Sequence, residues 1–172
     1  MEKGTVYFFT GLAGAGKTTI GGLFYQRLKA RKPNVIIADG DKMRIITHST
    51  GYSTEERRSR ALQSFRLWCE IAAQGIDVVV CSIALYDEVR DWNREHIENY
   101  KEIYIKARRE TLYLRDQKGL YSSGMKDVVG VDLPYDEPKN PDMVIENDGE
   151  ELPEAIVDRL WAAFRLEEDN FV

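Results

Sequence analysis

Apolar residues along the chain gather in short runs that alternate with longer amphipathic stretches. In the first run, Thr5–Thr10, apolar and β-branched residues follow one another without the polar alternation of a strand that is exposed on one face. Similar runs predict further strands at residues 35–38, 76–83, 102–107 and 143–146. Continuous apolar runs are typical of strands that are buried on both faces, as in a parallel sheet.

The stretches between these runs have the spacing of amphipathic helices. The first extends from residue 17 to about residue 30 and carries its large apolar side chains on one face. Ser53, with Glu56 three residues later, forms the capping box of a helix that ends near residue 73. Shorter helices are predicted at residues 41–47, 86–98, 109–115 and 153–166.

Strands that alternate with helices indicate the α/β class, because successive parallel strands need a crossover, which is right-handed. We predict a single domain over residues 1–172, with a five-stranded parallel sheet and helices on both of its faces. The segment at about residues 117–136 matches neither kind of element. A long irregular segment inside a compact domain is often a lid, so we predict a lid there.

Composition narrows the class of protein. The chain of 172 residues is 43% hydrophobic and 31% charged, which is typical of a globular protein with a real core. Its net charge of −5 argues against binding to a nucleic acid polymer, since such domains are usually basic. We expect no membrane association and a cytoplasmic location, because the first residues lack the features of a secretory signal and no apolar run has the length of a membrane span.

The chain has two cysteines, Cys69 and Cys81, which are too few for a disulfide framework. Both lie among apolar residues, so we expect two buried free thiols in a reducing compartment. A single disulfide between them is the alternative.

One segment carries a specific chemical motif. Gly11-Leu12-Ala13-Gly14-Ala15-Gly16-Lys17-Thr18 matches G-x-x-x-x-G-K-[ST] at every position, with an apolar strand before it and a helix after it. The glycines let backbone N–H groups turn toward phosphates, and the helix adds its positive dipole end. Lys17 places a charge on the β- and γ-phosphates, and the Thr18 hydroxyl is a ligand for Mg²⁺. We predict a P-loop NTPase fold with an Mg-ATP site formed by Gly11, Ala13, Gly14, Ala15, Gly16, Lys17, Thr18 and Thr19.

Two carboxylates, Asp39 and Asp41, follow the second predicted strand directly. Ligands of parallel sheets lie at the carboxyl ends of the strands, so we expect both side chains to face the phosphate loop. One would accept the proton of an acceptor hydroxyl, while the other orients Mg²⁺-bound water or substrate. We therefore predict catalytic roles for Asp39, Asp41 and Lys17. The alternative is a turn in which Asp41 caps the following helix.

Arginines and one aromatic residue come next along the chain. Arg57 and Arg60 are three residues apart and share a helix face, and guanidinium groups such as theirs and that of Arg44 bind anionic oxygens in a bidentate manner. The alternative is a solvated charged face, which we prefer for Arg58. The ring of Tyr52 either stacks on a nucleobase or packs against the helix that it precedes.

Arg115 and Lys118 open the predicted lid. A lid that closes over the phosphates excludes water at the moment of transfer. Either cation would then contact the phosphates or stack on the ATP base. The alternative is a surface loop after a helix that ends at an arginine and a glycine stop.

Together these motifs resemble the adenylylsulfate kinase (APS kinase) family, whose members phosphorylate the ribose 3′-hydroxyl of adenosine 5′-phosphosulfate. The resemblance extends from about residue 6 to residue 144. Asp39-Gly40-Asp41 with Arg44 resembles the family's D-G-D-x-x-R, and Gly51-Tyr52-Ser53 with Arg57 resembles G-F-S-x-x-x-R. Residues 115–121 resemble R-D-P-K-G-L-Y, and residues 130–138 resemble G-I-D-x-P-Y-E-x-P. Other P-loop kinases lack the last two patterns.

The resemblance implies a role for each matched residue. Asp39 would be the base or positioning group for the acceptor hydroxyl, with Asp41 close by. Arg44 and Arg57 would hold the phosphosulfate, and Tyr52 would stack on the acceptor base. In the same way, Arg115 would lie near the ATP adenine, and Lys118 would belong to the lid.

The chain departs from the family pattern on the acceptor side. Ile83-Ala84-Leu85-Tyr86 stands where the family has I-S-P-Y, so one serine hydroxyl is missing. Arg60 stands in place of an asparagine, and Val128 in place of a second aromatic ring that closes the base sandwich. The predicted acceptor site consists of Asp41, Arg44, Tyr52, Arg57, Arg60, Ile83, Ala84, Lys118 and Val128.

We therefore expect an Mg-ATP-dependent kinase of sulfate assimilation that phosphorylates adenosine 5′-phosphosulfate. The altered acceptor pocket leaves open a sister kinase with another activated nucleotide, such as a CDP-linked phosphoramidate or another pyrimidine. A nucleotide-binding switch or an inactive regulatory module is a third reading, which the presence of Lys17, Thr18 and Asp39 and the lack of an N-K-x-D motif disfavour. The partners would be ATP and a small nucleotide acceptor, and the resemblance suggests a homodimer.

Overall fold

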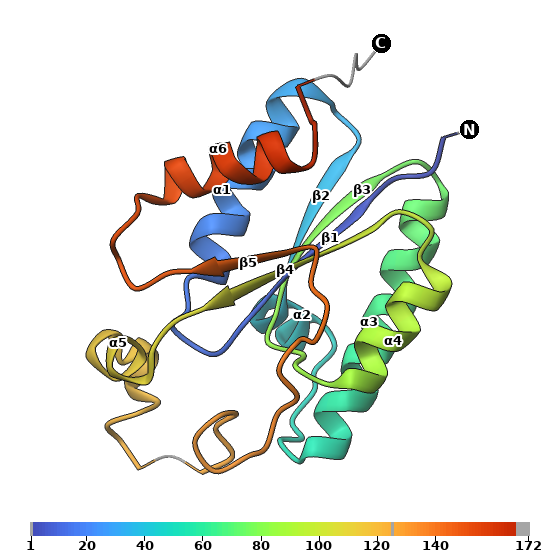
Figure 1. The fold of residues 1–172 in the computed structure, drawn as a ribbon. Helices are drawn as coiled ribbons and strands as arrows, with labels where there is room; N and C mark the ends of the chain where they lie inside the picture. Colours follow the sequence, from blue (N-terminus) through green and yellow to red (C-terminus); the bar gives the residue numbers. More distant parts are fainter. Residues whose placement is uncertain (1, 125, 168–172) are drawn as a thin grey trace.

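The computed structural model describes residues 2–124 and 126–167 and contains one five-stranded sheet. Its strands are β1 (Val6–Thr10), β2 (Val35–Asp39), β3 (Asp77–Cys81), β4 (Tyr100–Lys106) and β5 (Met143–Glu146). They are all parallel and lie in the order β2-β3-β1-β4-β5 (Figure 1). The prediction of a five-stranded parallel α/β fold is confirmed.

The strand order determines where ligands bind. β1 is central, and the chain leaves it for β2 at one edge of the sheet. After β3, the chain crosses β1 to reach β4 on the other side. A crevice therefore opens at the carboxyl ends of β1 and β3, which is where open parallel sheets bind their ligands.

Both faces of the sheet are buried. In β1, Val6 and Phe8 belong to one core cluster and Tyr7 and Phe9 to the other, and all four are almost fully inaccessible to solvent. Because successive side chains of a strand point to opposite faces, both sets must be apolar. This explains why the run lacks polar alternation.

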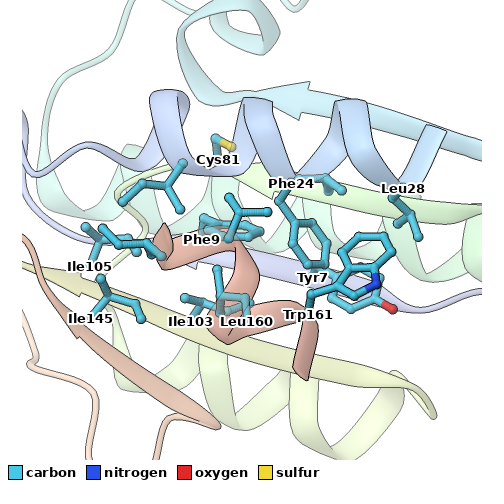
Figure 2. Packing of buried hydrophobic residues seen from close by; sticks show 14 of the residues in the cluster. Tyr7, Phe9, Phe24, Leu28, Cys81, Ile103, Ile105, Ile145, Leu160 and Trp161 are labelled. Carbon is cyan, nitrogen blue, oxygen red and sulfur yellow. The ribbon is translucent and has the colours of Figure 1, made fainter. Parts of the chain in front are cut away.

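The described residues form six α-helices, and four of them cover the faces of the sheet. The six are α1 (Lys17–Arg31), α2 (Gly40–Ile46), α3 (Thr54–Ala73), α4 (Asp87–His96), α5 (Arg109–Arg115) and α6 (Pro153–Ala163). α1 and α6 pack together on one face, and α3 and α4 on the other (Figure 1). Under α1 and α6, the Phe24 ring contacts Tyr7, Phe9 and Trp161, with centroid distances of 4.9, 5.4 and 5.7 Å (Figure 2). No helix in the described part of the chain is long and apolar enough to cross a membrane.

The ends of several elements differ from the predicted ones. β3 ends at Cys81, so Ile83 lies in a loop rather than in the strand. α4 and α6 end at His96 and Ala163, a few residues earlier than predicted. Such shifts arise because helix ends fray and periodicity does not mark them.

Two helix starts are defined by caps. The capping box of Ser53 and Glu56 at the start of α3 is confirmed. α2 begins at Gly40, and its cap is Asp39 rather than Asp41. The alternative that assigned the cap to Asp41 is therefore wrong, and Asp39 has a structural role in addition to any catalytic one.

Both cysteines are free thiols, as predicted. Cys81 is buried, and its burial raises the pKa of the thiol to about 12. Cys69 is only partly buried, so the prediction of two buried thiols is wrong for this residue. It packs against the edge of the core cluster under α3, and its Sγ donates to the His96 oxygen at 3.5 Å.

Phe24→Ala should lower the free energy of unfolding by about 3–5 kcal/mol, because removal of the fully buried ring leaves a cavity beside Tyr7 and Trp161. Urea unfolding followed by circular dichroism measures the change. Leu114→Ala removes a side chain that is 88% exposed and should change the value by less than about 0.5 kcal/mol. A decrease in the free energy of unfolding of less than about 1 kcal/mol for Phe24→Ala would show that this cluster contributes little to the stability of the core.

Candidate active site

The phosphate loop joins the carboxyl end of β1 to the start of α1. α1 begins after Gly16 without a side-chain cap and without an acidic residue in its first turn. The first N–H groups of any helix have no partner inside the helix. This end of α1 therefore presents unpaired donors and the positive end of the helix dipole, an arrangement that binds anions.

Side chains from distant segments hold the outer side of the loop. The Tyr121 hydroxyl donates to the Ala13 oxygen at 2.7 Å, Arg115 Nη1 to the Gly14 oxygen at 3.0 Å, and Asn147 Nδ2 to the Ala15 oxygen at 2.8 Å. In a trans peptide the carbonyl and the following N–H point in opposite directions. Carbonyls that are fixed outward therefore turn the N–H groups of the same peptides toward the inside of the loop.

Gly16 makes this geometry possible. Its φ of 106° lies in the left-handed region that other residues rarely adopt. A Cβ atom at this position would lie 2.4 Å from Nδ2 of Asn147. The motif thus needs glycine here both for the turn and for the approach of the asparagine.

Lys17 provides the charge of the loop. Its Nζ donates to the backbone oxygen of Leu12 at 2.8 Å. The cavity leaves the side chain partly accessible, but protein surrounds the ammonium group, and this desolvation lowers its pKa to about 8. The carboxylates of Asp41 and Asp39 nearby oppose the shift without cancelling it. A polyphosphate beside Lys17 would supply the missing counter-charge.

The two aspartates take different positions beside the loop. Asp39 Oδ1 accepts from the backbone N–H groups of Asp41 and Lys42 at 3.0 and 3.2 Å, and its Oδ2 lies 3.1 Å from Thr18 Oγ1. Asp41 instead forms an exposed ion pair with Lys118 at 2.5 Å. Both carboxylates therefore lie at the predicted edge of the sheet, and only Asp39 contacts the phosphate loop directly.

A cavity of about 250 Å³ begins at the phosphate loop and runs between α2, α3 and β3. Most of the predicted site residues line it: Ala13, Gly16, Lys17, Thr18, Thr19, Asp39, Asp41, Arg44, Arg57, Arg60, Ile83, Ala84 and Lys118. The donor and acceptor sides predicted from separate motifs thus share one cavity. The remaining predicted residues lie outside its lining, namely Gly11, Gly14, Ala15, Tyr52, Arg115 and Val128.

Three guanidinium groups form the end of the cavity that is distant from the loop. Their hydrogen bonds go to backbone oxygens: Arg44 donates to Ser49 and Thr50, Arg57 to Tyr52 and Asp127, and Arg60 to Gly51. Burial and the charges of Arg44 and Arg57 lower the pKa of Arg60. No carboxylate among the described residues forms an ion pair with these three side chains. Clustered like charges of this kind favour an anionic ligand.

Arg58 differs from these three arginines, since it forms an exposed ion pair with Glu88 at 3.2 Å, in line with a solvated face.

Neither Tyr52 nor Val128 lines the cavity. The Tyr52 side chain is half exposed, and the guanidinium carbon of Arg44 lies 3.5 Å from its ring centroid. Val128 is buried, and its neighbour Val129 lines the cavity instead. The Asp132 carboxylate sets this register, because it accepts from the backbone N–H groups of Asp127 and Val128, each at 2.6 Å.

The described residues of the predicted lid are irregular, with one short 3₁₀ turn at Gln117–Gly119 and a bridge between Val129 and Leu133. Gly130 has a φ of 84°, and a Cβ atom there would lie 2.8 Å from Cδ2 of Leu12 in the phosphate loop. This segment therefore packs directly on the loop, where a larger residue would not fit.

The cavity also includes residues that the sequence analysis did not single out. Ser64, Phe65, Trp68, Ser82 and Tyr86 line its walls. Ser64 lies one helical turn after Arg60, on the same face of α3. Its position could therefore have been predicted from that of Arg60. No local pattern marks Asn147 as a support of the phosphate loop.

Three features of the site together define a P-loop kinase, an enzyme that transfers a phosphoryl group. They are a lysine with a lowered pKa at an uncapped helix start, a carboxylate at the end of β2 and a cluster of arginines in the same cavity. A sequence model of the family described as adenylylsulphate kinase matches residues 3–146. The chain therefore belongs to the adenylylsulphate kinase (APS kinase) family.

Individual relatives support this assignment. A cytidine diphosphoramidate kinase of Campylobacter jejuni is 40% identical over 146 residues, which cover 83% of this chain and 85% of that protein. An adenylyl-sulfate kinase of a Picosynechococcus species is 37% identical over 160 residues, 90% of each chain. The structure of a Mycobacterium tuberculosis APS kinase in complex with AMPPNP and APS superposes with a TM-score of 0.86 at 23% identity, covering 96% of this chain and 99% of that one. This last likeness supports the fold alone.

Nucleotide binding should return Lys17 to its charged form, because a polyphosphate stabilises the ammonium and raises its pKa above about 8. At about pH 8.5, binding of a non-hydrolysable ATP analogue should take up about three quarters of a proton, and affinity should fall as the pH rises through that range. Calorimetry in buffers of different ionisation enthalpy measures the uptake. Lys17→Met should abolish the proton uptake. If the binding enthalpy of the unsubstituted protein does not depend on the buffer, the lowered pKa of Lys17 is contradicted.

Proposed function

We propose that this kinase transfers the γ-phosphoryl group of ATP to a ribose hydroxyl of a cytidine-diphosphate-linked acceptor, with cytidine diphosphoramidate as the leading candidate. The observation that carries the proposal is the asymmetry of the cavity. Its donor end matches the phosphate-loop motif at every fixed position, whereas its acceptor side departs from the adenylyl-sulfate pattern at Arg60, Ala84 and Val128. The relative with 40% identity is named for cytidine diphosphoramidate.

The base site favours a pyrimidine. Tyr52 is the aromatic ring that the family pattern assigns to the acceptor base. The second ring of that pattern is replaced by the aliphatic Val128, which is buried and does not line the cavity. Loss of one ring of a sandwich costs about 0.5–1.5 kcal/mol of stacking. Cytosine has one ring where adenine has two, so it loses less from a one-sided site.

The cationic end of the cavity suits a diphosphate-linked group. Three arginines offer forked donors to the oxygens of two linked phosphoryl groups. Ser64, Ser82 and Tyr86 line the same cavity, and each carries a hydroxyl, whose oxygen accepts a hydrogen bond as well as donating one. The amino group of a phosphoramidate is a donor, whereas the oxygens of a sulfate only accept. These hydroxyls would therefore distinguish the two terminal groups.

The donor end would hold Mg-ATP. The start of α1 and Lys17 would bind the phosphates, and Arg115, which is hydrogen-bonded to Gly14, would lie on the side of the adenine. Thr18 and Asp39 present a hydroxyl and a carboxylate oxygen within 3.1 Å of each other, the oxygen types that Mg²⁺ prefers. Within residues 2–124 and 126–167 no three His, Cys, Asp or Glu side chains form a metal site, so phosphate oxygens would complete the coordination. When bound, the ion would neutralise charge on the transferred group.

Asp39 is our candidate for the group that accepts the proton of the acceptor hydroxyl. Its carboxylate lines the cavity between the phosphate loop and the arginine cluster, and the N–H groups of α2 fix its orientation. Lys118 reaches across from the lid to Asp41 and would help to exclude water from the cavity. Catalysis would otherwise rest on positioning and on charge stabilisation.

Adenosine 5′-phosphosulfate is the second candidate acceptor. The adenylyl-sulfate kinase at 37% identity favours it, and so do the family patterns at residues 115–121 and 130–138. With this acceptor, the enzyme would belong to sulfate assimilation.

An ADP-release assay with purified protein and saturating Mg-ATP separates the two candidates. We expect kcat/KM for cytidine diphosphoramidate to exceed that for adenosine 5′-phosphosulfate by at least about tenfold, which is about 1.4 kcal/mol of transition-state discrimination. Mass spectrometry of the product verifies the added phosphoryl group, and Lys17→Ala should be inactive with both acceptors. A preference for adenosine 5′-phosphosulfate would refute the proposal in favour of the second candidate.

Asp39→Asn should lower kcat by about 10²–10⁴-fold while leaving ATP affinity and thermal stability nearly unchanged. Asparagine is as good a helix cap as aspartate, so the start of α2 should persist and only the charge is lost. Asp41→Asn is the matched control and should retain most of the turnover. Normal turnover in Asp39→Asn, with loss in Asp41→Asn, would transfer the proposed role to Asp41.

A further inference from the structure

The loop between β3 and α4 forms one wall of the acceptor end of the cavity. Ile83, Ala84 and Tyr86 of this loop line the cavity. Ala84 has a φ of 29°, a left-handed conformation that non-glycine residues adopt only at an energetic cost. Such a conformation persists only where neighbouring contacts hold it.

We propose that Asp136 is the positioning residue that holds this wall in place for the acceptor. The backbone N–H of Asp136 donates to the Leu85 oxygen at 2.9 Å. Its carboxylate Oδ2 accepts from the backbone N–H of Asp87 at 3.0 Å. One residue from a distant segment thus clamps the loop on both sides of Tyr86. The inference rests on the proposed kinase function, but not on the choice of acceptor.

The clamp also replaces a missing helix cap. Tyr86 occupies the cap position of α4 and makes no side-chain cap hydrogen bond. The first N–H groups of a helix need an outside partner, and a carboxylate is a favourable one at the positive end of the dipole. Asp136 supplies it from about fifty residues away in sequence. The strained turn at Ala84 and the start of α4 therefore depend on the same residue, the turn on its backbone N–H and the helix start on its carboxylate.

A buried arginine also holds Asp136 in position. Arg90 of α4 is 4% exposed, and its Nη2 donates to the Asp136 backbone oxygen at 2.8 Å and to Asp87 Oδ1 at 2.6 Å. Lys139 Nζ forms an ion pair with the other Asp87 oxygen at 2.5 Å. Because Arg90 is anchored in the core, Asp136 is fixed relative to the sheet and not only to the loop.

This arrangement links the wall to the end of the predicted lid. Asp136 is the last residue of that segment, whose Asp127 oxygen accepts from Arg57 of the arginine cluster. Tyr86 lies close enough to Arg57 and Arg60 for their charges to oppose the rise in its pKa that burial causes. Release of the clamp should therefore displace Tyr86 and Ala84, which face the acceptor, and leave the phosphate loop unchanged.

Asp136→Ala tests the clamp, because its loss should change the KM for the acceptor but not the KM for ATP. The acceptor KM should rise at least about fivefold, while the ATP KM stays within about twofold of the unsubstituted value. Asp136→Asn keeps an oxygen that accepts from Asp87 and should restore most of the acceptor affinity. Glu137→Ala is the matched control, because this neighbour pairs with Lys106 and Tyr104 rather than with the loop. Equal changes in both KM values, or no change in either, would overturn the proposal.

Amide hydrogen exchange provides a readout that does not depend on turnover. The Asp87 amide should exchange at least about tenfold faster in Asp136→Ala, because its hydrogen bond is lost. An unchanged rate would overturn the clamp even if neither nucleotide proved to be a substrate. If Asp136→Ala does not fold, Asp136→Ser, whose hydroxyl is one carbon too short to reach this amide in the same geometry, carries the same test.

Discussion

The active site depends on the desolvated ammonium of Lys17, held against the Leu12 carbonyl beside an uncapped helix start. Desolvation of a positive charge is costly in a folded protein, and the carboxylates of Asp39 and Asp41 offset this cost only in part. The central position of β1 brings the loop to the middle of the sheet edge, and α1 follows without a capping side chain. Carbonyl contacts from Tyr121, Arg115 and Asn147 then hold the loop open toward the cavity.

Asp39 joins this cationic loop to the rest of the cavity. Its two oxygens have different partners, the N–H groups of α2 on one side and the Thr18 hydroxyl on the other. A residue with both roles cannot be replaced freely, since a change in its length alters helix and loop together. The same carboxylate therefore sets the orientation of α2, which carries Arg44 toward the acceptor end. Donor and acceptor geometry are coupled through this one side chain.

Much of the fold and of the donor site could be read from the sequence, because both depend on local patterns. Apolar runs predict strands that are buried on both faces, and the phosphate loop is one contiguous motif. The positions where the structure differs from the prediction depend on contacts between residues that are far apart in the sequence. Val129 rather than Val128 lines the cavity because Asp132 folds the backbone around itself, and no spacing rule predicts this. Asn147 supports the loop only because β5 lies beside β4 at the carboxyl edge of the sheet.

The two halves of the cavity differ in how they are built, and this difference explains where the family pattern changes. The phosphate loop of the donor half is one continuous segment, which matches a single motif at every fixed position. The acceptor half is assembled from α2, α3, the loop after β3 and the segment before β5, which contact one another through hydrogen bonds that do not involve Lys17. Side chains that share no partners contribute to binding almost independently. A substitution at Arg60 or Ala84 therefore alters the fit of the acceptor without disturbing Lys17. An enzyme built in this way retains its chemistry while its choice of acceptor changes.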